Sequence, residues 1–411
     1  MGIRVLHLAD VHLGMENLGR VDAQTGLHSR LLDFLHSLDQ AVRFALEQEI
    51  DLVVFAGDAY KTRDPSPTQQ REFARRIKQL SDAGIPVVLL VGNHDLPNAD
   101  SKAHSLEIFR TLAVPQVQVV RRPQVFRLMT RRGEVQVAAL PYLSRSMLLA
   151  KDDYKNLGLE ELNLKIAETL SILVEGLARR LDPQLPSILT AHLSVANAVL
   201  GSEKSIMIGN DPVVPLSCLA RPEFDYVALG HIHRHQVLSL APPTVYAGSL
   251  DRIDFGEERE EKGFVVVDLA KGQTKFRFQP VQTRPLVTVN VDVDPQQPTE
   301  SVLAALEQVK LAGAIVRLNL RLEQAVLPLL RQAEINRVLQ ERAFWVAGIN
   351  REVTLPRGVV RQPEMTENLD PLTALQKYIH GREELRSQSE TLMNLARQLV
   401  AELREEEMSG Q

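Results

Sequence analysis

Residues 86–95 read PVVLLVGNHD, a run of six apolar residues followed at once by Gly, Asn, His and Asp. Such an apolar run, bounded by turn-forming residues, is typical of a strand that is buried on both faces. The same arrangement occurs twice nearer the N-terminus, as LVVFAGD at 52–58 and as IRVLHLADVH at 3–12. All three predicted strands therefore end in acidic or histidine side chains.

Helical patterns separate these three strands. Between the first two, apolar residues recur at helical spacing from 31 to 45. Before the third, Ser66 and Gln69 form a capping-box pattern with Pro67 at the first helical position, and Gly84 is suited to end that helix. Alternation of buried strands and helices predicts an α/β domain whose sheet is covered on both faces.

Strand patterns dominate the stretch that follows. Three of them succeed one another between 116 and 141, and a helical pattern then spans 162–177. We predict that these elements and the later strands complete one large α/β domain over residues 1–280. The later strand patterns lie at 187–193, 226–230, 244–248, 263–269 and 275–281.

A second, smaller unit begins near Pro285. Alternating apolar residues at 287–293, and again at 316–322, predict half-buried strands, and each is followed by a helical pattern. The strand-like run FWVAGI then occupies 344–349. This order predicts a small α/β domain over residues 285–355.

The C-terminal tail, residues 369–408, follows a Pro-containing stretch at 355–371 that we expect to be a linker. Two apolar stripes at helical spacing, one on each side of Gly381, predict two short amphipathic helices. Helices this short are marginal in water unless their apolar face is buried. The tail can either fold back on the small domain or dock on a partner protein. The stripes contain Leu372, Leu375, Ile379, Leu392, Leu395, Leu399, Val400 and Leu403.

The composition excludes several classes of protein. Of the 411 residues 44% are apolar and 24% charged, which is typical of globular proteins. No apolar stretch approaches the roughly 20 residues of a membrane span, and we expect no signal peptide. A net charge of −5 argues against a sequence-specific DNA reader but not against a nuclease. The single cysteine, Cys218, excludes an internal disulfide and a cysteine-based zinc cluster, and it predicts a cytoplasmic location.

Side chains that suit a pair of metal ions follow strand ends throughout the large domain. Ligands of open α/β sheets bind at the carboxyl ends of the strands. Carboxylates, imidazoles and amide oxygens suit manganese, iron or zinc, and two such ions can bind a phosphate diester together. The nine candidate residues are Asp10, His12, Asp58, Asn93, His94, Asp95, His192, His231 and His233.

Each of these motifs taken alone is weak support. An isolated Asp-x-His or His-x-His seldom binds metal, and Gly-Asn-His-Asp can be a simple turn after a strand. Five such elements, each at a strand end and in one order, favour a metal site over that plain structural explanation. They are Asp-x-His at 10–12, Gly-Asp at 57–58, Gly-Asn-His-Asp at 92–95, the single His192, and Gly-His-x-His at 230–233.

In their order the five elements resemble the motifs of the calcineurin-like metallophosphoesterases. The likeness extends to GSLDRIDFGE at 248–257, which is similar to a stretch of SbcD-type nucleases. Those nucleases belong to the bacterial SbcC–SbcD complex, which processes DNA double-strand breaks. The resemblance implies a β-sandwich flanked by helices, a small α/β capping domain that binds DNA, and a helical tail that docks on an SMC-like ATPase of the SbcC type.

The resemblance also implies two metal ions, most simply Mn2+, held by seven of the candidates. It assigns one ion to Asp10, His12 and His233, the other to Asn93, His192 and His231, and both to a bridging Asp58.

The remaining two candidates take catalytic roles by the same resemblance. His94 would protonate the leaving sugar oxygen or stabilise its charge, and Asp95 would orient His94 by accepting its other ring N–H. The sequence departs from many relatives at one position, because Lys61 stands where they carry a histidine. Lys61 and Arg63 either contact a phosphate or are simply two solvated loop cations.

The function that the resemblance implies is a manganese-dependent DNA exonuclease and endonuclease. It would form a homodimer and act with the SMC-like ATPase. Two alternatives remain: a metallophosphoesterase that acts on a small phosphodiester or a phosphoprotein, and a catalytically silent scaffold on the same fold.

Overall fold

A computed structural model of the chain describes residues 2–97, 102–143, 158–201, 213–354, 371–380, 385 and 388–409. By their contacts, residues 1–322 and 328–352 form one compact unit, and residues 323–327 and 353–411 form a second. The linker predicted at 355–371 lies almost entirely outside the described residues. The predicted domain boundaries stay predictions.

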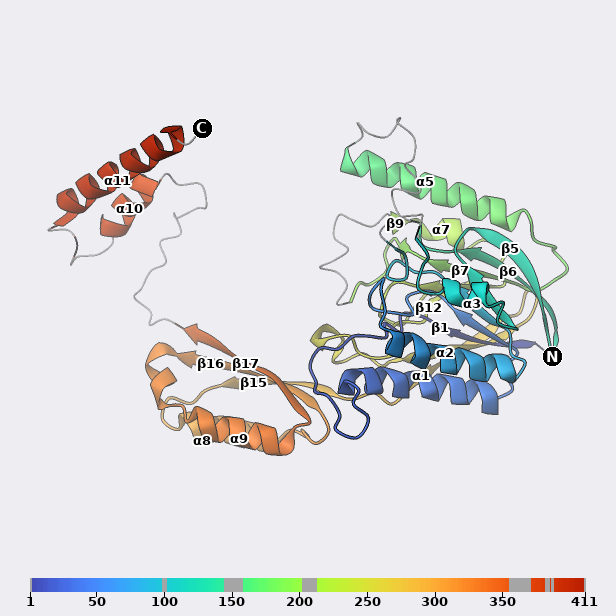
Figure 1. Cartoon of the computed structure of the whole chain (residues 1–411), viewed down its shortest axis with the longest axis horizontal. Coiled ribbons are helices and arrows are strands. Elements are labelled where there is room, and N and C mark those ends of the chain that lie inside the picture. The colour runs from blue at the N-terminus through green and yellow to red at the C-terminus, as the bar shows by residue number, and fades with distance from the viewer. Residues whose placement is uncertain are drawn as a thin grey trace. The chain divides into compact units, whose positions relative to one another are not determined.

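Two six-stranded sheets form the body of the first unit (Figure 1). Both are mixed. In the first sheet the antiparallel strands lie at one edge and the parallel strands continue to the other edge. In the second sheet the four central strands are parallel and both edge strands are antiparallel to their neighbours. The first has the order β14 (Lys275–Pro280), β13 (Gly263–Leu269), β1 (Ile3–Leu8), β2 (Leu52–Phe55), β3 (Val87–Leu90), β4 (Val117–Val120). The second has the order β11 (Gln236–Leu240), β12 (Pro243–Tyr246), β10 (Tyr226–Gly230), β7 (Ser187–His192), β6 (Gly133–Leu140), β5 (Gln124–Thr130).

The sheets pack face to face, and helices cover their outer faces. Val5 of β1 lies in the core between the sheets, whereas Leu6 and Leu8 of the same strand pack against the helices outside. This follows from the alternation of side chains along a strand, and it explains why the strands are apolar on both faces. The prediction of a β-sandwich flanked by helices is confirmed. The covering helices are α1 (Ser29–Glu47), α2 (Pro67–Asp82) and α3 (Glu107–Thr111) on the first sheet, and α5 (Leu159–Ala178) and α7 (Leu216–Leu219) on the second.

The start of α2 follows the predicted capping box. The Ser66 hydroxyl accepts the backbone N–H of Gln69, and the Gln69 side chain accepts the backbone N–H of Ser66. This cap fixes where the loop after β2 ends. A short additional ladder joins β8 (Ser194–Val195) to β9 (Val213–Val214).

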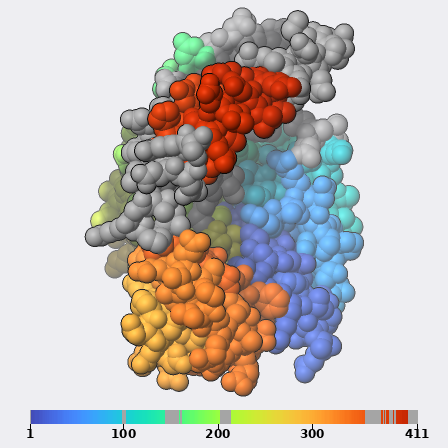
Figure 2. Space-filling model, turned by 90° about the vertical axis from the view of Figure 1, so that its left-hand side faces the viewer, coloured from blue at the N-terminus to red at the C-terminus, as the bar shows by residue number. Residues whose placement is uncertain are grey.

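A small three-stranded sheet follows the sandwich (Figure 1), and the part of the chain that contains it has an orange surface in Figure 2. Arg284 connects it to the sandwich: its guanidinium donates to both Asp33 oxygens, at 2.7 and 2.8 Å, and stacks on Phe344. The predicted alternation of strands and helices is present. The elements are β15 (Leu286–Asp292), α8 (Pro298–Glu307), β16 (Ile315–Glu323), the 3-10 helix η3 (Gln324–Leu329), α9 (Gln332–Arg342) and β17 (Trp345–Thr354).

The second unit contains two helices, α10 (Pro371–His380) and α11 (Ser389–Ser409), which pack against each other. Ile379 and Met393 are buried, whereas Leu395 and Leu399 are 58% and 52% exposed. Two amphipathic helices, as predicted, are therefore present, with apolar side chains left open to solvent. Among the described residues, no helix is both long and apolar enough to cross a membrane.

Candidate active site

All nine candidate residues lie at the carboxyl ends of central strands. Those from β1, β2 and β3 come from one sheet, and those from β7 and β10 come from the other. The parallel neighbours within each sheet end at the same edge. The sandwich therefore brings together loops that are far apart in sequence, as the hydrogen bond between the His231 N–H and Asp10, across 221 positions, illustrates.

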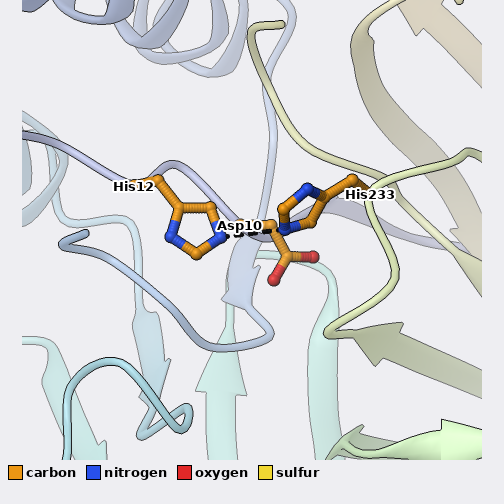
Figure 3. A group of neighbouring side chains, drawn as sticks. All are labelled: Asp10, His12 and His233. Carbon is orange, nitrogen blue, oxygen red and sulfur yellow. Dashed lines mark hydrogen bonds between the residues drawn. The ribbon is translucent and has the colours of Figure 1, made fainter. Parts of the chain in front are cut away.

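Asp10, His12 and His233 form the first group of potential ligands, and their donor atoms lie within 4.8 Å of one another (Figure 3). The Nε2 atoms of His12 and His233 are 3.0 Å apart. Both oxygens of Asp10 accept the backbone N–H of His231 at 3.0 Å, which orients the carboxylate. All three side chains are buried.

A second group contains Asn93, His192 and His231. The Asn93 Oδ1 atom lies 2.9 Å from Nε2 of His192 and 3.1 Å from Nδ1 of His231. Asp58 stands between the two groups: its Oδ2 is 3.3 Å from Nε2 of His192 and 3.8 Å from Nε2 of His12. Asp58 therefore lies within 4 Å of a histidine nitrogen from each group.

The backbone at the site is strained. Asp10, His12, Asp58 and His231 have φ values of 52°, 49°, 57° and 100°, in the left-handed region that residues with a Cβ rarely adopt. Each such residue costs about 1–3 kcal/mol, and strain of this kind concentrates at functional sites. The fold thus holds these four side chains in place against the local preference of the chain.

The arrangement of the potential ligand atoms favours a cation at the site. The Nδ1–H of His192 donates to the Ala56 carbonyl at 2.7 Å, so in the neutral ring the lone pair of Nε2 faces two oxygens, Oδ1 of Asn93 and Oδ2 of Asp58. Burial lowers the pKa of His192, but the Asp58 carboxylate outweighs it and raises the pKa to about 9. The site therefore attracts positive charge, and divalent ions fit its imidazole, carboxylate and amide donors.

His94 lies beside these groups. Its ring is edge-on to the His12 ring, with centroids 4.9 Å apart, and its backbone N–H donates to Oδ1 of Asp58 at 2.8 Å. Its Nδ1 donates to the Lys61 carbonyl at 2.8 Å, so Nε2 is the atom left to face a substrate. Burial lowers the pKa of His94, the Asp58 carboxylate raises it, and the net shift is downward.

The prediction that Asp95 orients His94 is wrong. The Asp95 carboxylate is fully buried and accepts backbone N–H groups of Gly92, Asp58, Ala59 and Tyr60 at 3.0–3.4 Å. Because the chain turns after Asn93, the two adjacent side chains diverge. Asp95 instead connects the loop after β2 to the loop after β3 through these hydrogen bonds.

Replacing Gly92 tests how tightly this region is packed. A Cβ at position 92 would overlap the Asp58 carboxylate and lie 2.5 Å from the Asp58 backbone nitrogen. We expect Gly92→Ala to displace Asp58 and to lower the hydrolysis rate of an aryl phosphodiester by about 100-fold. Gly176→Ala is the matched control, since a Cβ there meets nothing within 4 Å. A wild-type rate in Gly92→Ala would show that the site tolerates this displacement.

Two side chains at the site were not singled out from the sequence. The ring of half-buried Tyr142 lies 6.1 Å from that of His231 and 6.3 Å from that of His192. Glu257 accepts the Nδ1–H of His233 at 2.9 Å. No sequence signal marks Tyr142, whereas Glu257 ends the run at 248–257 that supported the resemblance.

Comparison with known proteins agrees with the geometry. Residues 3–235 match the calcineurin-like phosphoesterase family. The SbcD component of the nuclease SbcCD of Bacillus subtilis is 30% identical over 281 residues, 66% of this chain and 67% of the relative. The SbcD component of Rhodobacter capsulatus is 28% identical over 369 residues, 84% of this chain and 87% of the relative.

An archaeal protein is similar as well. The DNA double-strand break repair protein Mre11 of Haloferax volcanii is 26% identical over 349 residues, 84% of this chain and 67% of the relative. The predicted family and enzyme class are thereby confirmed. The chain belongs to the calcineurin-like phosphoesterases and, within them, to the SbcD-type nucleases, as a metal-dependent hydrolase of phosphodiester bonds.

Proposed function

We propose that the chain is a manganese-dependent DNA exonuclease and endonuclease, and the nuclease component of an ATP-dependent complex that repairs double-strand breaks. The observation that carries the proposal is the pair of ligand groups that share Asp58, with His94 beside them. The names of the relatives support DNA as the substrate.

In this proposal seven side chains hold two Mn2+ ions. Two such ions would bind the phosphate diester, lower the pKa of a water molecule and stabilise charge on the attacking and leaving oxygens. Asp58 fixes the distance between the two ligand groups, and the buried Asp10 is held by the His231 backbone. The ligands are Asp10, His12 and His233 on one side, Asn93, His192 and His231 on the other, and Asp58 between them.

His94 acts on the leaving group. Because its Nδ1 is already committed to the Lys61 carbonyl, only Nε2 can deliver a proton to the departing sugar oxygen. The carbonyl contact also sets the direction of the ring, so the role that the resemblance gave to Asp95 falls to the backbone of Lys61.

Substrate choice tests the proposal. We expect the manganese-loaded chain to cleave a 3′-recessed duplex and a DNA hairpin, and to lose that activity when a chelator removes the metal. Cleavage of an aryl phosphodiester without cleavage of DNA would instead favour a small-substrate phosphoesterase. Bound metal without hydrolysis of any of these substrates would favour the scaffold.

The partners belong to the proposal as well. We expect a homodimer in the cytoplasm that binds an SbcC-like SMC-family ATPase through the C-terminal helices and DNA through the small domain. Exposed Leu395 and Leu399 on α11 support a helix-in-groove contact, and the polar side chains Arg317, Asn319 and Arg321 along β16 support contact with DNA.

Deletion of residues 369–411 should abolish co-purification with the ATPase and ATP-stimulated end processing, because the docking helices are lost. Manganese-dependent cleavage of short single-stranded DNA should persist, since the deleted segment contributes no candidate ligand. Both activities are measured on the same preparations, with the ATPase added in excess.

Two double substitutions in α11 separate docking of the tail from its folding. Leu395→Glu with Leu399→Glu should weaken ATPase binding about 10-fold or more, whereas Asn394→Glu with Gln398→Glu adds the same charge to neighbouring exposed positions and should retain it. Full stoichiometry of ATPase with the truncated chain would contradict the assignment of α10 and α11 as the main docking element.

A further inference from the structure

Glu257 contacts the proposed metal ligand His233, and both oxygens of its carboxylate accept hydrogen bonds. Its Oε1 accepts the Nδ1–H of His233 at 2.9 Å, and its Oε2 accepts the Ile253 N–H at 3.0 Å and the Ser249 hydroxyl at 3.2 Å. The side chain is fully buried. The contact to His233 fixes the tautomer of that ring, so that the lone pair on Nε2 faces His12 and the metal position.

A buried lysine completes this arrangement. Nζ of Lys262 lies 2.8 Å from the Glu257 carboxylate and donates to the backbone carbonyl of His233 at 3.0 Å. Lys262 is only 2% exposed. Burial alone would raise the pKa of Glu257, but the hydrogen bond from His233 and the Lys262 ammonium outweigh it and lower the pKa. Glu257 is therefore a carboxylate that accepts a hydrogen bond from the ring of His233, while Lys262 donates one to the backbone carbonyl of the same residue.

The same loop contacts the small domain. Phe255 and Glu257 belong to the 3-10 helix η2 (Phe255–Glu257), and the Phe255 ring lies 4.3 Å below the Arg317 guanidinium of β16. Glu258 accepts the N–H and the hydroxyl of Thr288 on β15, at 2.9 and 2.5 Å. Three residues of one short segment thus face in two directions, Glu257 toward His233, and Phe255 and Glu258 toward the small sheet.

We infer that Glu257 is a positioning residue for His233, and that the segment 255–258 makes metal affinity at the His233 position depend on docking of the small domain. This inference rests on the metal site of the proposed function. A carboxylate behind a metal-bound histidine raises its basicity and fixes its direction, and removal of such a group typically costs 10- to 100-fold in metal affinity. Undocking the small domain releases Phe255 and Glu258, and with them the backbone on both sides of Glu257.

Calorimetric titration of the full-length chain with Mn2+ tests the first half of the inference. We expect Glu257→Ala to weaken one of the two Mn2+ sites by about 10- to 100-fold and to leave the other close to wild type. Glu257→Gln retains an acceptor for the Nδ1–H and should recover most of that affinity. Equal Mn2+ affinities in the wild type and Glu257→Ala would overturn the positioning role.

A substitution in the small domain tests the second half. Arg317→Leu removes the contact to Phe255 without touching the metal site, and we expect it to weaken the same Mn2+ site by about 2- to 30-fold. Arg331→Leu is the matched control, because Arg331 lies in the same small domain but pairs with Glu300 and Glu334. Unchanged Mn2+ affinity in Arg317→Leu would overturn the link to the small domain.

The outcomes also separate this inference from the proposed function. A wild-type chain that binds no Mn2+ contradicts the metal site itself. A wild-type chain with two Mn2+ ions, both unaffected by the Glu257 and Arg317 variants, leaves the metal site intact and contradicts only the inference. A purely structural role of Glu257 predicts a lower melting temperature of the metal-free chain with both sites weakened alike, and this result too would contradict selective positioning.

Discussion

Replacement of Asp58 by alanine should abolish metal-dependent hydrolysis. The Asp58 carboxylate is within 4 Å of donor atoms from both ligand groups, 3.3 Å from His192 and 3.8 Å from His12. It also accepts the His94 backbone N–H, so in the proposed two-metal site its loss disturbs the metal ligands and His94 together. A bridging ligand is worth several kcal/mol to the transition state, and we expect a loss of about 10³-fold or more in kcat.

Asp10→Ala is the comparison for this experiment, because Asp10 belongs to one ligand group only. We expect Asp10→Ala to lower the affinity of one Mn2+ ion, whereas Asp58→Ala lowers the affinity of both. Stoichiometry from equilibrium dialysis and turnover of an aryl phosphodiester are measured on the same samples. Two tightly bound ions and wild-type turnover in Asp58→Ala would remove the two-metal assignment.

Much of the site could be predicted because its signals are local. Parallel strands end at one edge of a sheet, so residues directly after such strands meet in space wherever they stand in the sequence. Asp10, Asp58 and His231 meet for this reason. The capping box at Ser66 could also be predicted from the sequence, because both partners of a cap lie within one helical turn.

The neighbourhood of His94 was harder to predict because it depends on the course of a loop. The family resemblance implied that Asp95 would accept the His94 ring N–H. The turn instead directs Asp95 into the protein, where it accepts four backbone N–H groups, and the His94 ring meets the Lys61 carbonyl. A backbone acceptor carries no residue-type signal, so sequence alone cannot identify it.

Glu257 illustrates a different limit. It is 24 residues from His233, in a three-residue 3-10 helix that is too short to show a periodicity in the sequence. A buried carboxylate is costly unless it is paired and hydrogen-bonded, but the partners that satisfy Glu257 become evident only in the folded chain. The sequence marked the run at 248–257 as distinctive without assigning its glutamate.

Replacement of His94 by glutamine should lower kcat by about 10²–10⁴-fold, the usual contribution of a general acid, while both metal ions stay bound. Because Nδ1 donates to the Lys61 carbonyl, Nε2 can donate a proton only when the ring is cationic. The pKa of His94 is lowered by burial, against the pull of the Asp58 carboxylate. The acid form is lost as the pH rises through that lowered pKa, so the wild-type kcat profile should have a limb that falls with rising pH.

The pH profile distinguishes this role from a contribution to folding or metal binding. In His94→Gln the descending limb should disappear, because glutamine has no proton to lose, and the residual rate should be flat on that side. His36→Gln, at an exposed position of α1, should retain the wild-type profile. If His94→Gln instead lost one Mn2+ ion, the histidine would be a ligand, as its place in a group with His12 and Asp58 also permits. Turnover, metal stoichiometry and the pH limb together therefore decide between an acid and a ligand at position 94.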